Sequence, residues 1–246
     1  ELYAPFDGGK RYVKMEMPGV LPDIMSSDGE RLWLRAVTFD RELSIQPDFP
    51  PHLFCSMGFL DDSGWELTYW MYGDHMFGGR AGVAHAISLY PTARIMVCGD
   101  DEIYGHQDGY ERIRKPLFIA SPKVPVLKRT KRGKRTIQKV THRWGKEVPL
   151  HVRGLVLAAG RLFMIGPPKI DSATTRALMK TLTTDAYHPQ PEFADALATF
   201  QGAKGSLLCA VTTADGALAS QIDLPLNPVF DGLIAANGSL YVSTVD

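Results

Sequence analysis

The chain has 246 residues, 45% of them hydrophobic, and its 27 Lys and Arg residues balance its 27 Asp and Glu residues. This length forms one large domain or two small ones with a sizeable core, and the composition excludes an intrinsically disordered chain. The balanced charge argues against a general polyanion binder, and no stretch approaches the roughly 18 apolar residues that begin to indicate a membrane-spanning helix.

The first predicted element is a hairpin. Residues 24–29 lead through Gly29 into Leu32–Leu34, and the turn between them carries Ser, Asp and Gly, which favour tight turns. The next hairpin brackets Gly99–Asp101, with strands predicted over 94–98 and 102–105.

The stretch from Gly58 to Tyr90 concentrates aromatic rings beside charged side chains. Aromatic faces with carboxylates and an Arg are typical of a ligand surface, whereas large aromatics also fill the core between packed sheets. Both interpretations stay open. The candidate ligand-binding residues are Asp61, Asp62, Trp65, Trp70, Arg80 and His85, together with Arg153 further along the chain. Asp61–Gly64 is expected to be a turn, and no metal site is predicted.

A basic run follows at about residues 123–146. It holds nine Lys or Arg residues and no Asp or Glu between Lys128 and Lys146. We expect a solvated loop; the alternative is a contact with a polyanion or an acidic partner, made by Lys128, Arg129, Lys131, Arg132, Lys134 and Arg135.

Three further segments complete the chain. A hairpin is predicted over 153–164 with Ala159-Gly160 as its turn, and another over 205–224 around the turn Thr213–Gly216. Between them, about residues 171–202 are expected to form a helical insertion, with Pro191 at a first helical position. The last hairpin turns at Asn237-Gly238, the strongest two-residue hairpin signal.

The hairpin at 153–164 repeats in 231–242 without a gap, offset by 78 residues. Without the predicted insertion, this offset falls within the roughly 40–50 residues of a propeller blade. Strands do not alternate with long helical patterns, which argues against a doubly wound α/β fold. We therefore predict an all-β chain of antiparallel four-stranded β-propeller blades over 1–246, with a β-sandwich as the alternative. Because isolated blades leave edges uncovered, we expect the segment to need the rest of a larger ring, a circular closure with itself, or a partner, and the first of these, as the C-terminal part of a larger ring, is the one we favour.

The segment Val211–Gly216, followed by Asn237-Gly238-Ser239-Leu240-Tyr241-Val242, resembles the blade repeat of the pyrroloquinoline-quinone (PQQ)-like propeller superfamily. More narrowly, Leu21–Ile24, Pro51–Phe54 and Val152–Pro168 resemble uncharacterised planctomycete propeller proteins. This resemblance implies a bacterial, extracytoplasmic protein. Ser220 stands where the repeat often carries a docking Trp, and the adjacent-cysteine pair of quinoprotein dehydrogenases is missing, so neither PQQ nor calcium is expected as a cofactor.

Function is predicted less closely than fold. We expect a non-catalytic binding or scaffolding propeller that recognises a carbohydrate, peptide or protein partner through loops on one face. The alternative is a PQQ-dependent dehydrogenase-like or hydrolytic enzyme with its site at the propeller channel. Expected partners are the rest of the propeller or another protein subunit; nucleic acid is not expected.

Overall fold

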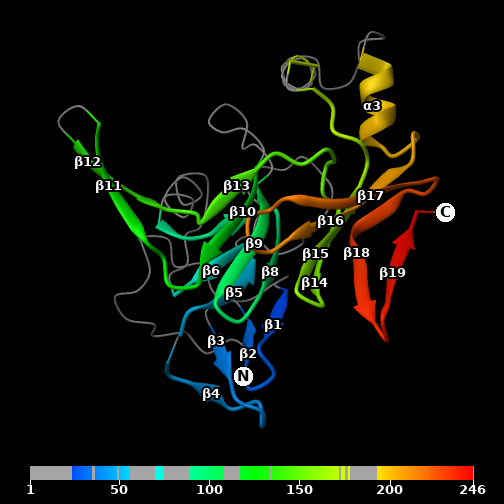
Figure 1. Cartoon of the computed structure of the whole chain (residues 1–246). Helices are drawn as coiled ribbons and strands as arrows, with labels where there is room; N and C mark the ends of the chain where they lie inside the picture. Colours follow the sequence, from blue (N-terminus) through cyan, green and yellow to red (C-terminus); the bar gives the residue numbers. More distant parts are fainter. Residues whose placement is uncertain are drawn as a thin grey trace. The chain divides into compact units, whose positions relative to one another are not determined.

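The structure is a computed structural model that describes residues 24–34, 37–48, 50–55, 70–74, 89–107, 117–132, 135–171, 173–174, 177 and 193–245. These residues form several antiparallel sheets and one short helix, α3 (Ala194–Phe200) (Figure 1). The all-β prediction is therefore confirmed, whereas the arrangement of the sheets as propeller blades stays a prediction. No helix in the described part of the chain is long and apolar enough to cross a membrane.

The chain divides into two compact units. Unit 1 comprises Glu1–Gly105 and Ile119–Arg143, and unit 2 comprises His106–Phe118 and Trp144–Asp246. The two units are described separately below.

Short strands make up the sheets that begin in unit 1. One sheet has the order β1 (Met25–Ser27), β2 (Leu32–Leu34), β3 (Val37–Phe39) and β4 (Ile45–Gln46). A second sheet contains β5 (His52–Cys55), β6 (Trp70–Gly73) and β7 (Thr92–Ala93). A third has the order β13-β10-β9-β8, formed by β8 (Ile95–Cys98), β9 (Glu102–Gln107), β10 (Leu117–Pro122) and β13 (Trp144–Lys146). The predicted hairpins at 24–34 and 94–105 are thus confirmed.

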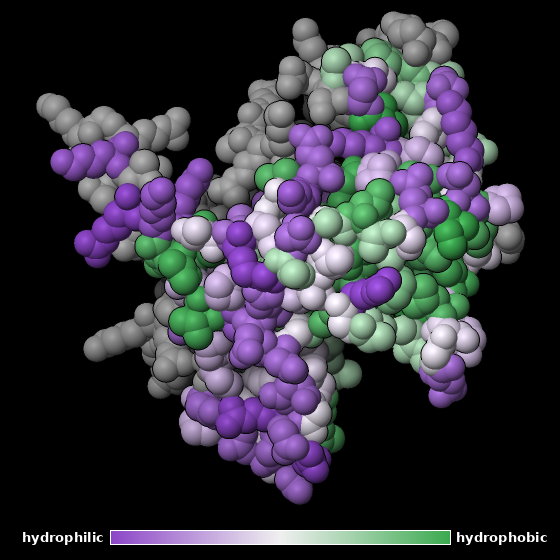
Figure 2. All heavy atoms as spheres, in the orientation of Figure 1, coloured by the Kyte–Doolittle hydropathy of each residue, from purple (hydrophilic) through white to green (hydrophobic). Residues whose placement is uncertain are grey.

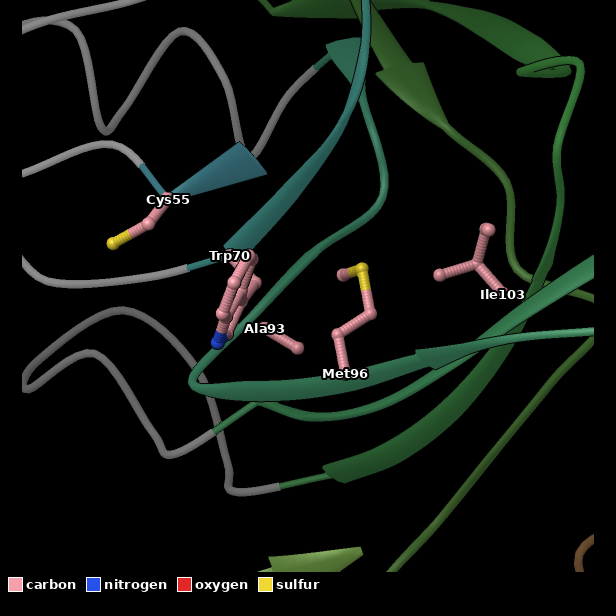
Figure 3. Packing of buried hydrophobic residues seen from close by; sticks show 5 residues of the cluster. All are labelled: Cys55, Trp70, Ala93, Met96 and Ile103. Atoms are coloured by element: carbon pink, nitrogen blue, oxygen red, sulfur yellow. The ribbon is translucent and has the colours of Figure 1, made fainter. Parts of the chain in front are cut away.

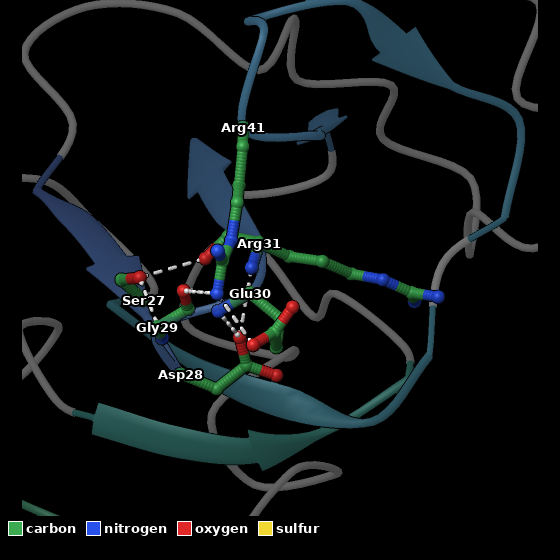
Figure 4. A network of polar contacts seen from close by, with 6 residues as sticks. All are labelled: Ser27, Asp28, Gly29, Glu30, Arg31 and Arg41. Atoms are coloured by element: carbon green, nitrogen blue, oxygen red, sulfur yellow. Dashed lines mark hydrogen bonds and ion pairs between the residues drawn. The ribbon is translucent and has the colours of Figure 1, made fainter.

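The turn between β1 and β2 is held by its own side chains (Figure 4). Asp28 Oδ1 accepts hydrogen bonds from the backbone N–H groups of Glu30 and Arg31, each at 2.9 Å. Partial burial opposes ionisation of Asp28, but these N–H donors outweigh it and lower the pKa of the carboxyl. Gly29 has a φ of 92°, which explains why a glycine stands in this turn.

The core of unit 1 gathers five buried side chains from β5 to β9 (Figure 3): Cys55, Trp70, Ala93, Met96 and Ile103. Trp70 comes from β6, beside Ala93, its register partner on β7. Large apolar side chains in such a cluster each contribute roughly 1.5–3 kcal/mol through burial. This cluster therefore fixes how β5, β6 and β7 meet β8 and β9.

The basic run is not the loop we expect from the sequence. Leu127–Arg132 (β11) and Arg135–Val140 (β12) pair antiparallel in a two-stranded hairpin, with Lys128 opposite Lys139 and Arg132 opposite Arg135. We call these two strands the basic ribbon. Threonine, isoleucine and valine within the run favour extended backbone, and this β propensity offsets the unfavourable concentration of like charges.

Unit 2 is built around one four-stranded sheet. Its order is β14 (Gly154–Ala158), β15 (Arg161–Gly166), β16 (Ser206–Thr212) and β17 (Leu218–Leu224). A two-stranded sheet of β18 (Pro228–Ala236) and β19 (Ser239–Thr244) follows, and Leu233 of β18 lies against Gly154 of β14. The predicted hairpins at 153–164, 205–224 and 231–242 are all confirmed.

Two of these hairpins turn with the same backbone geometry. Ala159 and Gly160 have φ angles of 48° and 68°, and Asn237 and Gly238 have 51° and 74°. Two consecutive residues with positive φ match the right-handed twist of the flanking strands. The sequence repeat therefore reflects a structural repeat.

The predicted helical insertion is described in part. Residues 178–192, which include Pro191, lie outside the described residues. Helix α3 begins at Ala194, three residues after the predicted first position, and Phe193 at its N-cap makes no side-chain capping bond. The apolar spacing in this segment predicts a helix, and α3 confirms it for the described residues.

Candidate binding groove

The residues predicted from the sequence as a ligand site lie in different settings. Asp61, Asp62, Trp65, Arg80 and His85 are outside the described residues, so their convergence stays a prediction. Trp70 belongs to the buried core cluster of unit 1, which agrees with the core-packing interpretation for that residue.

Arg153 is 6% exposed and serves the packing of unit 2. Its guanidinium donates to Asn227 Oδ1 at 2.6 Å and to the Phe200 carbonyl at 2.5 Å, and it lies 5.8 Å from the centre of the Phe200 ring. Because α3 leaves carbonyls without helical partners at its C-terminal end, this arginine satisfies one of them and fastens the helix to the start of β14.

The basic residues predicted to contact a partner lie on the basic ribbon. Lys128, Arg129 and Lys131 are exposed on β11. Arg132 and Arg135 face each other in the register, and Lys134 lies outside the described residues.

A groove that the sequence does not predict lies on one face of the sheet in unit 2. It has a volume of about 580 Å³, and we call it the β17 groove. Its floor is apolar and comes from neighbouring strands, with Met164 of β15 opposite Cys209 of β16 and Val211 two residues further along β16. The remaining lining residues are Lys146, Glu147, Val148, Pro149, Lys169, Gly216, Ala217, Leu218 and Gln221.

A β-bulge directs Leu218 into this groove. Ala210 pairs with Ser220 but Val211 pairs with Leu218, so Ala219 is an extra residue without a partner. In a regular strand, Leu218 would share a face with Ile222, four residues away. The bulge reverses this, because Leu218 lines the groove while Ile222 does not.

Trp144 anchors the segment that forms the opposite wall. Its indole N–H donates to the Thr213 carbonyl at 3.0 Å, and its ring packs 5.5 Å from the ring of Phe118. A Cβ at Gly216 would lie 2.7 Å from the indole, so only glycine permits this approach. The contact places residues 146–149 across from β17.

The rim of the β17 groove is polar. Lys169 Nζ lies 2.9 Å from Glu147 Oε2, which neutralises both charges. Beside Gly216, Asp215 accepts a hydrogen bond from the Thr212 hydroxyl and another from the Ala217 N–H, and these bonds, with a smaller effect of Lys146, lower the pKa of its carboxyl. The rim therefore offers a fixed pattern of donors and acceptors around an apolar floor.

The nucleophilic side chain in the groove is not activated. Burial, with a smaller effect of Asp223, raises the pKa of the Cys209 thiol to about 11, and the thiol donates to Gln221 Oε1 at 3.9 Å. Among the described residues, no three His, Cys, Asp or Glu side chains gather as a metal site. The groove is equipped to hold a ligand, and its cysteine is protonated at neutral pH.

Sequence reasoning missed the groove for a physical reason. The two strands of the hairpin at 205–224 are visible in the sequence, but the bulge at Ala219 is not, because Ala217-Leu218-Ala219-Ser220 carries no glycine or proline to mark it. The polar rim residues stand far apart in the chain and form no motif.

No family model, curated protein or solved structure matches this chain.

Proposed function

We propose that this chain is a non-catalytic binding protein built from propeller blades, and that its β17 groove holds an extended segment of a partner protein. The observation that carries the proposal is the placement of Leu218, an exposed apolar side chain that a bulge turns toward an apolar floor. An apolar groove with a few polar groups at its rim is the usual form of a recognition site.

Strand order supports the blade architecture. The sheets β1–β4 and β14–β17 each place four strands in chain order. The sheet of β8, β9, β10 and β13 also follows chain order, with the basic ribbon inserted between β10 and β13. Blades of a propeller are four-stranded antiparallel sheets of this kind. The repeat of the hairpin at 153–164 in 231–242 supports the same architecture.

The lining favours a peptide over a carbohydrate. Sugar rings bind against aromatic faces, and none of the described residues that line the β17 groove is aromatic. Strand β17 is the last strand of its sheet, so its outer edge offers backbone N–H and C=O groups to an extended segment. Apolar side chains of that segment would pack on Met164 and Val211.

The experiment is a selection of displayed random peptides on the purified chain, followed by anisotropy titration of the selected peptide. Leu218→Lys should abolish saturable binding because it places a charge over the apolar floor. Ile222→Lys is the matched control: Ile222 is exposed to a similar extent on the same strand, at 55% against 52% for Leu218, but it does not line the groove.

Equal loss of binding in the two variants would place the site elsewhere and overturn the proposal. A second outcome would also overturn the proposal: the selection yields no peptide that binds saturably, but a glycan from a panel binds the chain. Loss of that glycan binding in Leu218→Lys would show that the groove holds a carbohydrate instead. Thermal unfolding of both variants shows whether each remains folded.

A further inference from the structure

The basic ribbon differs from the rest of the described surface in how its charges are compensated. Elsewhere, five surface cations pair with carboxylates: Arg31 with Asp48, Arg41 with Glu30, Arg143 with Glu102, Lys169 with Glu147 and Lys204 with Asp195. No such pair involves Lys128, Arg129, Lys131 or Lys139, the ribbon cations whose side chains the structure describes. The whole chain is neutral, so positive charge is segregated onto this hairpin.

The register in which β11 pairs with β12 makes this concentration of positive charge unfavourable for stability. Lys128 lies opposite Lys139, and both are exposed on the same face of the ribbon. Arg132 and Arg135 occupy the next like-charged register position toward the turn. Like charges directly across an antiparallel pair are destabilising, and carboxylates placed on the same face as Lys128 and Lys139 would reduce this repulsion.

The ribbon also has two free edges. Among the strands that the structure describes, β11 and β12 pair with each other and with no third strand, so each has one side whose backbone groups have no described sheet partner. The hairpin extends away from β9 and β10 in Figure 1, and the residues that Figure 2 colours toward its tip are hydrophilic, whereas Leu127 at its base is partly exposed. A partner strand can therefore reach it.

We propose that the basic ribbon binds an acidic, extended polypeptide segment by adding it as a third strand. In an extended chain, alternate side chains share one face at a spacing of about 6.6–6.8 Å. Arg129 and Lys131 repeat with this period on β11, so carboxylates at alternate positions of a paired strand would meet them in register. The backbone pairing and the charge pairing then support each other.

The free edges distinguish this partner from other polyanions. A nucleic acid or a sulfated glycan neutralises the charges but leaves the strand edges unpaired. Single-stranded nucleic acid also binds through aromatic stacking, and the segment from Leu127 to Val140 contains no aromatic residue. The proposal is independent of the β17 groove, because the ribbon lies in unit 1 and the groove in unit 2.

The probe is a fluorescent peptide of alternating Glu and Thr residues, titrated at low salt by anisotropy against the full chain. A second peptide has the same sequence with N-methyl groups on alternate backbone nitrogens, which keep the charge and remove hydrogen-bond donors. We expect the N-methylated peptide to bind more weakly than the first. Binding of both should weaken as salt screens the charges.

The variant neutralises the four described exposed cations of the ribbon and is compared with a variant of equal charge change. The ribbon variant carries Lys128→Gln, Arg129→Gln, Lys131→Gln and Lys139→Gln, and the control carries Arg31→Gln, Arg41→Gln, Arg161→Gln and Lys204→Gln, none of which lies on the ribbon or lines the β17 groove. The ribbon variant should lose roughly tenfold or more in affinity, since each exposed pair contributes a fraction of a kcal/mol. The control should keep its affinity within about twofold.

Equal binding of the two peptides would overturn strand addition, and equal loss in the two variants would overturn the ribbon as the site. Heparin and a short DNA duplex are titrated at the same charge concentration; tighter binding of either than of the acidic peptide would overturn the choice of a polypeptide. Lysines on edge strands also prevent aggregation. If that were their whole role, the ribbon variant would aggregate and no probe would bind the unmodified chain, which would overturn the proposal.

Discussion

Glycine 216 shows how a single residue can determine one wall of the β17 groove. Its φ of 69° is nearly the same as the 68° of Gly160, so both positions lie in the left-handed region. They differ in their surroundings, because a Cβ at Gly216 would meet the Trp144 indole while a Cβ at Gly160 would have nothing within 4 Å. Comparing substitutions at Gly160 and Gly216 therefore separates the cost of backbone strain from the cost of a steric clash.

Gly160→Ala should lower the free energy of unfolding by about 1–2 kcal/mol through backbone strain alone. Gly216→Ala should cost about 1–3 kcal/mol more, because the Trp144 ring must move. Urea denaturation followed by tryptophan fluorescence measures both. Equal losses for the two variants would show that Trp144 is not held against the turn.

Cysteine 209 gives unit 2 a dependence on alkaline pH. Burial raises the pKa of its thiol from 9.0 to about 11, so the folded state holds this proton more tightly than the unfolded chain. The resulting stability is complete below about pH 9 and is lost as the pH rises through about 11.

Cys209→Ala should therefore be less sensitive to pH than the unmodified chain between pH 9 and 11. Urea midpoints at closely spaced pH values give the comparison. Alkylation with iodoacetamide at pH 8 provides a second readout: Cys209 should react only after unfolding. Rapid alkylation of the native chain at this residue would contradict the burial of the thiol.

At the scale of elements, the two matching hairpins differ in how well their turns suit their backbone. Ala159 and Asn237 occupy the same turn position with φ angles of 48° and 51°. Asparagine tolerates the left-handed region because its side chain hydrogen-bonds locally, whereas alanine is strained there. The first hairpin is thus the less favourable of the two.

Ala159→Asn should raise the free energy of unfolding by about 0.5–1 kcal/mol. Asn237→Ala is the reciprocal test and should lower it by a similar amount. Thermal unfolding in a calorimeter detects changes of this size. A destabilising effect of Ala159→Asn would indicate that local contacts of Ala159, rather than its φ angle, control the turn.

The sequence predicts an element where the backbone conformation at a turn restricts which residue types can stand there. Asn237-Gly238 and Ala159-Gly160 identify their hairpins because positive φ favours few residue types. The basic ribbon was not predicted because its charges dominate the pattern and hide the β-prone Thr130 and Ile137. The β17 groove depends on a bulge and on Trp144 packing at Gly216, which are tertiary features without a local signature.

At the scale of the whole molecule, we expect uncovered sheet surface to govern how the chain behaves in solution. Strand β19 ends its two-stranded sheet, so one of its sides has no partner among the strands that the structure describes. On β18, Leu233 is buried against Gly154, while Ile234 points to the other face and lies opposite Tyr241. Ile234 and Tyr241 are 59% and 50% exposed, and together they form an apolar cross-strand pair beside a free edge.

An exposed apolar pair at a free edge is a site for association, because a second strand buries the pair and completes the backbone hydrogen bonds. We expect the purified chain to self-associate as its concentration rises, and Ile234→Lys to reduce this association. Met25→Lys is the control, since Met25 is 67% exposed in unit 1, on a different sheet. Sedimentation velocity across a concentration series measures the effect. If both variants associate like the unmodified chain, the edge at β19 is not the contact, and the apolar pair is tolerated as ordinary surface.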